Sequence, residues 1–282
     1  MRCFQASLGG LASAAAVALA GALMLAAPLT ASAQSDDETL KGIEEYRKAL
    51  QEGNPAELVS MRGEELWKTP QGPKKVSLEK CDLGLGAGVV KGAYAQLPRY
   101  FADTDQVMDF EARLVHCMVT LQGFDRAEVT KKPFSGGGQR QTEIEALAAY
   151  VVEESRGMRI AVPQSHPKEK AAFDRGKTLF YMRAGPYDFA CSTCHGVDNQ
   201  RIRLQDLPNF EKPEPAQRAF GTWPAYRVSQ GALRTMQWRI NDCFRQQRFP
   251  EPTFISQGTI DLITFLGVKA AGGVMDSPAI KR

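Results

Sequence analysis

Three segments of the chain place apolar residues at helical spacing. Two are residues 142–154 and 168–182, and the third starts at Thr259, the expected N-cap of its helix. Side chains three, four and seven positions apart share one helix face, so each segment predicts an amphipathic helix. The apolar positions are Ile144, Leu147, Ala148, Val151, Val152, then Ala171, Ala172, Phe173, Leu179, Phe180, then Ile260, Leu262, Ile263, Phe265 and Leu266. No segment alternates apolar and polar residues over several positions, so we expect a mainly α fold.

Loops rich in glycine and proline separate these helices. Residues 135–138 are Ser-Gly-Gly-Gly, and residues 163–167 begin and end with proline. Both stretches predict loops, since glycine and proline interrupt regular structure. The second loop suggests a domain boundary near residue 160, and hence domains at residues 34–160 and 161–282.

The first residues have the layout of a secretory signal peptide. Arg2 is followed by an apolar stretch over residues 11–27 and then by Ala31-Ser32-Ala33, an A-x-A cleavage site. An uncleaved membrane anchor is the alternative, but the apolar stretch is shorter than the ~20 residues that a spanning helix needs. Residues 1–33 are therefore predicted to be a signal peptide, and the exported chain is expected to have no membrane span.

Charge excludes one class of partner. Removing residues 1–33 takes away only Arg2 among the charged residues, which leaves 34 basic and 32 acidic residues. No basic stripe with interleaved aromatic residues is present, so a nucleic-acid partner is not expected.

The segment Cys191-Ser192-Thr193-Cys194-His195 carries the clearest chemistry. C-x-x-C-H is the attachment motif of covalently bound haem c: each cysteine forms a thioether bond, and the histidine becomes an axial iron ligand. A zinc or redox C-x-x-C motif is the alternative. A zinc site needs a second ligand pair, however, and the other cysteines of the exported chain stand singly. Bacteria attach this haem after export, so the motif and the signal together predict a periplasmic c-type cytochrome.

An internal repeat accounts for the remaining cysteines. Gly63-x-x-Leu66-Trp67 begins as far before Cys81 as Gly176-x-x-Leu179-Phe180 begins before Cys194. Tyr94-x-x-x-Pro98-x-Tyr100 precedes Cys117 as Phe220-x-x-x-Pro224-x-Tyr226 precedes Cys243, and Arg113 and Arg239 each lie four residues before their cysteine. This order of matches predicts two copies of one module. The fold expected is two tandem cytochrome c-like domains.

The first copy lacks the residues that hold haem. Leu78, Cys81 and Asp82 stand where the second copy has two cysteines and a histidine. One covalent haem c per chain is therefore expected, in the second domain only. Cys81 and Cys117 would be left close together in an oxidising compartment, which predicts a disulfide between them.

The second axial ligand of the haem has two candidates. Met236 is the usual type of ligand in an electron carrier. Cys243 is the rival, because its counterpart Cys117 is expected beside the lost haem site. The repeat favours Cys243, although a buried inert cysteine is the ordinary alternative.

The residues 239–243, Arg-Ile-Asn-Asp-Cys, together with Pro224-x-Tyr226-Arg227 and the haem motif, resemble SoxA, the catalytic cytochrome subunit of the SoxAX complex in bacterial sulfur oxidation. The resemblance covers essentially the whole exported chain, including residues 81–86 and 155–157. Because the chain lacks the first C-x-x-C-H motif of the two-haem members, it resembles the single-haem branch of this family.

The resemblance implies an enzyme that conjugates thiosulfate oxidatively to a cysteine of SoxY in the SoxYZ carrier, as a heterodimer with the cytochrome SoxX. It implies that Cys243 is an axial ligand carried as a persulfide and that Arg239 binds substrate. On a helix these two side chains share a face, which would place a guanidinium beside the sulfur. Arg239 could instead be a surface charge or pair with a haem propionate. A plain electron-transfer cytochrome remains the alternative function.

Overall fold

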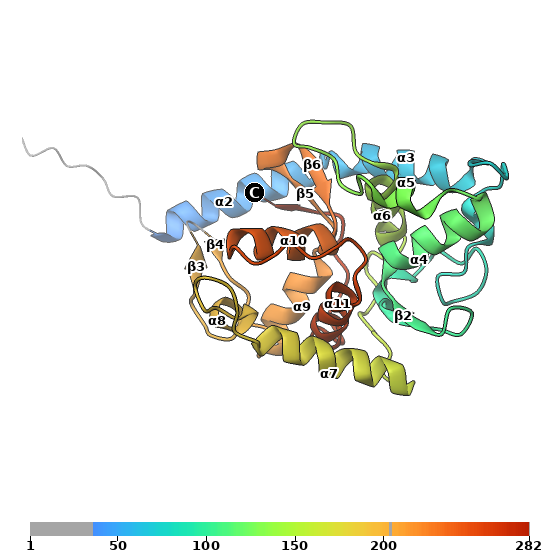
Figure 1. The fold of residues 1–282 in the computed structure, drawn as a ribbon. Coiled ribbons are helices and arrows are strands. Elements are labelled where there is room, and N and C mark those ends of the chain that lie inside the picture. Colours follow the sequence, from blue (N-terminus) through green and yellow to red (C-terminus); the bar gives the residue numbers. More distant parts are fainter. Residues whose placement is uncertain (1–35, 203–204, 282) are drawn as a thin grey trace, which may run out of the picture. The chain divides into compact units, whose positions relative to one another are not determined.

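The computed structural model describes residues 36–202 and 205–281 (Figure 1). The predicted signal peptide lies outside these residues. Helix α2 (Asp36–Gln51) comes first, and the chain divides into two units after Tyr46. The second unit, within which the elements below are compared, is described at residues 47–202 and 205–281. No helix among the described residues has the length and hydrophobicity that crossing a membrane requires.

The same order of elements occurs twice. We call residues 56–153 the first copy and residues 167–269 the second copy. The first copy contains α3 (Ala56–Lys68), η1 (Leu78–Lys80), η2 (Tyr94–Gln96), β1 (Arg99–Phe101), β2 (Gln106–Met108), α4 (Phe110–Cys117), η3 (Met118–Gln122), α5 (Arg126–Thr130) and α6 (Glu143–Glu153). The second contains α7 (Pro167–Tyr181), α8 (Cys191–His195), β3 (Arg201–Ile202), β4 (Gln205–Asp206), α9 (Pro213–Gly221), β5 (Ala225–Arg227), η4 (Val228–Gln230), β6 (Ala232–Arg234), α10 (Met236–Gln246) and α11 (Gln257–Lys269).

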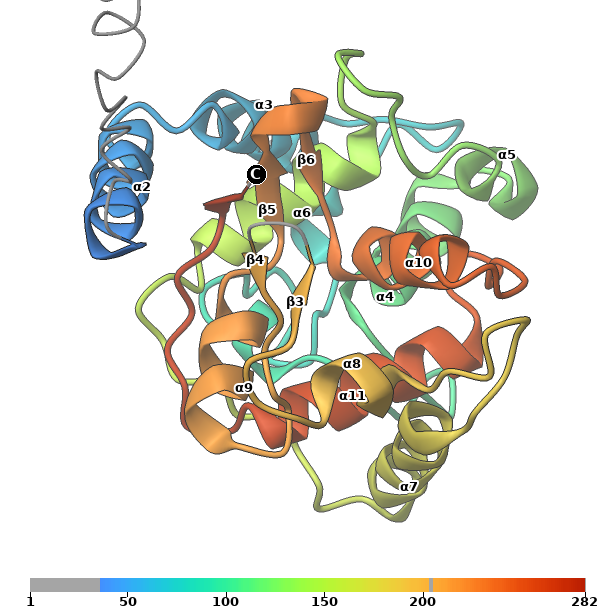
Figure 2. The same cartoon turned by 90° about the vertical axis from the view of Figure 1, so that its left-hand side faces the viewer.

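Each copy is built on a pair of crossing helices, α3 with α6 and α7 with α11 (Figures 1 and 2). A glycine sits at each crossing. A Cβ on Gly63 would lie 2.0 Å from the carbonyl oxygen of Ala146, and a Cβ on Gly176 would lie 2.0 Å from that of Asp261. Only a residue without a side chain permits this approach, which explains why glycine recurs at this position of the repeat.

The predicted helices are present, but the N-cap predicted for the third helix is wrong. Thr142 caps α6 in a capping box with Glu145, as the pattern of residues 142–154 suggests. The final helix starts earlier than predicted, because Ser256 and not Thr259 is its N-cap. The hydroxyl of Ser256 accepts a hydrogen bond from the backbone N–H of Thr259. Pro167 belongs to α7 rather than to the loop before it, because proline suits the first helical turn.

Short strands escaped the sequence analysis. β1 pairs with β2, β3 pairs with β4, and β5 lies between β6 and the C-terminal strand β7 (Ala279–Lys281). The pairing is antiparallel except between β5 and β7. These strands have two or three residues, too few for an alternating pattern to be recognised.

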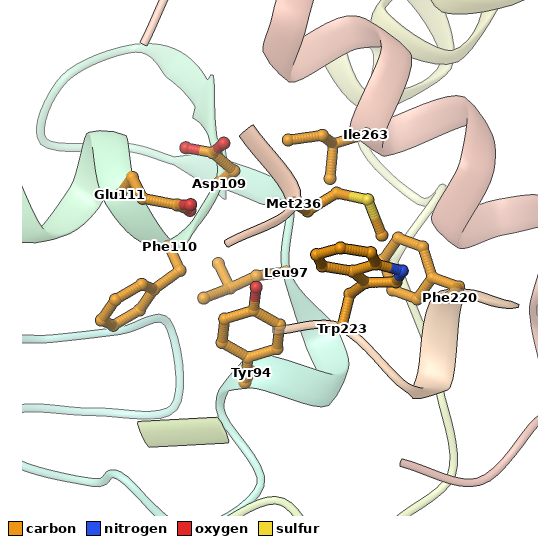
Figure 3. A pocket seen from close by; sticks show the side chains of 9 residues that line it. All are labelled: Tyr94, Leu97, Asp109, Phe110, Glu111, Phe220, Trp223, Met236 and Ile263. Atoms are coloured by element: carbon orange, nitrogen blue, oxygen red, sulfur yellow. The ribbon is translucent and has the colours of Figure 1, made fainter. Parts of the chain in front are cut away.

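The two copies meet around a small cavity of about 10 Å³ (Figure 3). Tyr94, Leu97, Asp109, Phe110 and Glu111 of the first copy line it together with Phe220, Trp223, Met236 and Ile263 of the second. Two buried polar contacts join the copies nearby. Asp109 accepts a hydrogen bond from Gln237 at 2.6 Å, and Glu145 pairs with Arg234 at 2.9 Å. The copies therefore share one core.

Candidate functional site

The haem motif forms the short helix α8. Its first turn is held at Ala190, whose N–H donates to the hydroxyl of Thr193 at 3.0 Å. Cys191, Cys194 and His195 are thus presented by one turn of backbone. Residues 205–210 fold back beside this turn, where the N–H of Phe210 donates to the carbonyl oxygen of His195 at 2.8 Å.

His195 is held in the orientation that an iron ligand needs. Its Nδ1 lies 2.9 Å from the carbonyl oxygen of Pro208, so Nδ1 carries the proton and Nε2 is left with a free lone pair. The ring also packs edge-on against Phe210, with centroids 5.7 Å apart. Burial lowers the pKa of His195, the Pro208 contact raises it, and nearby Arg239 lowers it further. The imidazole is therefore neutral at pH 7, as a metal ligand must be.

Helix α10 brings the other predicted residues to the same place. Thr235 caps the helix by accepting from the N–H of Trp238. Arg239 and Cys243 follow one turn apart. Cys243 lies close enough to α8 that its charge would raise the pKa of Cys191, and Cys194 in turn raises that of Cys243.

The environment of the Cys243 sulfur is largely buried and positively charged. Burial is the main cause that raises the pKa of this thiol, while Arg239 and Arg227 lower it and Asp242 raises it. Burial likewise raises the pKa of Cys191 to about 12. The side chains present have the chemistry that a haem c would need: the thiols of Cys191 and Cys194 could form thioether bonds, and the His195 imidazole and the Cys243 sulfur could ligate iron.

Asp242 organises the guanidinium groups. Its carboxylate is 6% exposed and accepts from Arg239 at 3.0 Å, from Gln246 at 2.7 Å and from Arg245. All three partners lie three or four positions away on α10. Asp242 therefore fixes Arg239 beside the sulfur.

The corresponding place in the first copy is closed by a disulfide. Cys81 and Cys117 are bonded, which confirms the predicted pair, and their exposed fractions are 1% and 3%. Asp82, at the histidine position, accepts from the N–H groups of Gly84 and Gly86 at 2.6 and 3.0 Å. Cys191, Cys194 and Cys243 are free thiols.

Known proteins resemble this chain over most of its length. The cytochrome c domain family of SoxA and TsdA matches residues 62–160. The L-cysteine S-thiosulfotransferase subunit SoxA of Hydrogenophilus thermoluteolus is 54% identical over 269 residues, which cover 95% of this chain and 98% of that protein. The chain belongs to the SoxA family. A SoxA of Hydrogenobacter thermophilus is 32% identical over 81% of this chain and 82% of its own.

The fold of the SoxA family member agrees with a solved structure. The crystal structure of SoxXA from P. pantotrophus superposes with a TM-score of 0.69 and 21% identity, and the match covers 84% of each chain. The resemblance drawn from residues 239–243 and the haem motif is thereby confirmed. As a SoxA cytochrome c, this chain uses haem c.

Sequence reasoning on this SoxA family member missed two site residues. Pro208 acts through its backbone carbonyl, which no side-chain pattern reveals. Asp242 stands directly before Cys243, and its importance follows only from the three donors that converge on it. Met236, the rival ligand, is 6% exposed and lines the cavity between the copies.

Proposed function

We propose that this SoxA family member joins thiosulfate oxidatively to a cysteine of a SoxY carrier, with Cys243 as the reacting sulfur and Arg239 as the substrate-binding residue. One observation carries the proposal: α10 places Cys243 against the haem motif of α8 and beside Arg239. An electron carrier needs no arginine next to its axial ligand. The relatives' name, L-cysteine S-thiosulfotransferase, describes the same reaction.

One haem c would be attached through Cys191 and Cys194, and His195 and Cys243 would ligate its iron. The free Nε2 of His195 and the nearness of Cys243 to both cysteines support this ligand set. When bound, the haem supplies a path for electrons. The first copy holds no haem, because a leucine and an aspartate, Leu78 and Asp82, replace its cysteine and histidine.

The chain's own residues bind and orient the reactants. Thiosulfate and a thiol form one S–S bond, and this releases one proton and two electrons. Arg239 can donate a forked pair of N–H groups to the sulfonate oxygens, while Asp242 holds the guanidinium in place. Cys243 is partly buried, which limits the access of water to its sulfur.

Two tandem cytochrome c-like domains, at residues 34–160 and 161–282, form the chain after the signal peptide of residues 1–33 is removed in the periplasm. The repeated order of helices, the two crossing glycines and the family match that ends at residue 160 support this division. The second electron requires another acceptor. A heterodimer with the cytochrome SoxX would provide it, and co-purification with a small c-type cytochrome under native expression tests this pairing.

Cys243→Ser tests the function most directly. The variant keeps covalent haem, which depends on Cys191, Cys194 and His195, but we expect it to lose thiosulfate conjugation. We also expect it to lose the thiolate signature in the absorption and electron paramagnetic resonance spectra. The assay supplies thiosulfate, the SoxYZ carrier and the partner cytochrome.

Retained activity in Cys243→Ser would show that Cys243 is not the reacting sulfur and would favour a plain electron-transfer cytochrome. A near-infrared charge-transfer band in the wild-type protein would point to methionine ligation by Met236 and argue the same way.

A further inference from the structure

The two copies allow the arginine beside the cysteine to be compared within one chain. The hairpins β1–β2 and β5–β6 have the same register, because Arg99 pairs with Met108 as Ala225 pairs with Arg234. Helices α4 and α10 follow at the same offset, so Arg113 of the first copy corresponds to Arg239 of the second. Each neighbour of one arginine therefore has a counterpart near the other.

In the first copy this arginine is fully occupied. Arg113 donates to the two carboxylate oxygens of Asp103 at 2.7 and 2.9 Å and to the carbonyl oxygen of Asp82 at 2.6 Å. The ring of Phe101 covers its guanidinium at 4.2 Å. The Arg113 side chain is only 5% exposed. These contacts neutralise the charge and leave little room for a ligand.

In the second copy the corresponding partners have changed. Ser229 occupies the position of Asp103, so the hairpin offers Arg239 no carboxylate. Arg227 occupies the position of Phe101, so a second guanidinium replaces the covering ring. The exposed fraction of the Arg239 side chain rises to 24% accordingly. In place of a covered arginine, the second copy therefore has two neighbouring guanidinium groups, both of them partly exposed.

Arg227 is the less satisfied member of this pair. Its Nε is buried and has no hydrogen-bond partner in the part of the chain that the structure describes. Burial, and then the charge of Arg239, lower the pKa of Arg227, and the nearby carboxylate of Asp242 opposes them only in part. The guanidinium groups of Arg227 and Arg234 both lie over the ring of Trp238. Arg234, however, forms an ion pair with Glu145 at 2.9 Å. A half-buried guanidinium whose buried Nε lacks a hydrogen-bond partner is costly, so this arrangement suits an anion that comes from outside the chain.

We propose that Arg227 is a second substrate-binding residue, which together with Arg239 clamps a dianionic sulfur oxyanion beside Cys243. This inference rests on the proposed function. It adds that the site binds a substrate with two negative charges. Asp242 balances only part of the local positive charge, since it already serves Arg239 and Arg245. Two guanidinium forks match two negative charges spread over several oxygens better than one fork does.

The test uses the haem-loaded chain and two probes, thiosulfate and the unreactive dianion sulfate. Arg227→Phe restores the residue type of the first copy, and we expect both anions to bind about 10- to 100-fold more weakly by titration calorimetry, as the loss of a charged hydrogen bond implies. Arg227→Lys keeps the positive charge but lacks the forked pair of N–H donors. Its affinity for both anions should lie between those of the wild type and Arg227→Phe. Arg218→Ala removes an exposed arginine from α9 and should leave affinity unchanged.

A second readout is the carrier-dependent assay, in which Arg227→Phe should raise the KM for thiosulfate by a similar factor, with a smaller change in kcat. Anion affinities within twofold of wild type in both Arg227 variants would overturn the proposal. So would a shifted haem reduction potential with unchanged anion affinity, because that result would make Arg227 a partner of a haem propionate. Absence of conjugation by the wild-type protein would instead contradict the proposed function, and the binding titrations separate the two failures.

Discussion

Asp242 and Arg239 form an ion pair on α10 near the sulfur that we propose to react. Asp242 is nearly buried, and its three donors, all on α10, hold it in one orientation. Arg239 is thereby fixed one turn before Cys243, where its charge opposes the effect of burial on the thiol pKa. The residue that we propose to bind substrate thus also favours the ionised form of the Cys243 sulfur.

Arg239→Ala removes a charged donor without touching a haem ligand. We expect thiosulfate-dependent activity to fall by roughly one to two decades, the range that the loss of a charge-assisted contact of ~1.5–3 kcal/mol implies. The absorption spectrum should stay close to that of the wild type. Steady-state kinetics and spectra of the same samples check both statements. An altered spectrum with full activity would show that Arg239 serves the haem instead.

At the scale of elements, both helix pairs depend on one close approach. Gly176 on α7 meets the backbone of α11, and Gly63 on α3 meets that of α6 in the same way. Neighbouring backbone cannot move aside as the end of a long side chain can, so a methyl group at either glycine must push the helices apart.

Gly176→Ala should therefore lower the unfolding free energy by about 1–3 kcal/mol or more. Gly258→Ala on α11 is the matched control, because its added Cβ would meet Leu179 at an ordinary 3.6 Å. The control should be neutral or stabilising by about 0.5–1 kcal/mol, the usual preference of a helix for alanine. Urea unfolding of the haem-loaded proteins measures both. Equal stability of Gly176→Ala and wild type would contradict the crossing geometry.

The disulfide ties η1 to the end of α4 in the copy without haem-binding residues. Its cysteines are 36 residues apart in sequence. For a loop of that size, chain entropy predicts a stabilisation of about 3–4 kcal/mol. We expect the double variant Cys81→Ser, Cys117→Ser to lose about this much unfolding free energy while it keeps its haem content.

Mass spectrometry gives the haem count, and one haem per chain is the value expected. Two haems, or free thiols at both positions in the native protein, would refute this account of the first copy.

At the scale of the whole molecule, two buried carboxyl groups stand where the copies meet (Figure 3). Burial raises the pKa of Asp109 to about 6, and burial together with Asp109 raises that of Glu111 to about 8. One oxygen of Glu111 has no hydrogen-bond partner within the described residues. The fold therefore favours the protonated form of this pair.

This preference makes stability depend on pH. Unfolded carboxyl groups titrate near pH 4, so the folded chain binds more protons than the unfolded chain between about pH 4 and 8. The stability contributed by the pair is complete below that range and is lost as pH rises through it. Glu111→Gln should flatten the profile and raise stability at pH 8, whereas the exposed control Glu214→Gln should change neither. Unfolding free energies from pH 4 to 8 decide the matter, and identical profiles for wild type and Glu111→Gln would be the contrary result.

The sequence by itself determined the covalent chemistry and the repeat. C-x-x-C-H needs its residues in one turn, so residues 191–195 are recognisable without a fold. The periodicity of residues 142–154 and 168–182 likewise reflects one buried face of a helix. The pairing of Cys81 with Cys117 followed from comparing the copies. Such features depend on neighbours in sequence or on equivalence between positions.

The tertiary structure alone decided which distant groups meet. The contact of the Pro208 carbonyl with His195 depends on how the loop after α8 folds back, and the burial of Asp109 and Glu111 depends on packing between the two copies. The unpartnered guanidinium of Arg227 belongs to the same class, since a missing partner is visible only when every neighbour is in place. Hydrogen-bond satisfaction is a property of the packed molecule, and local patterns carry no record of it.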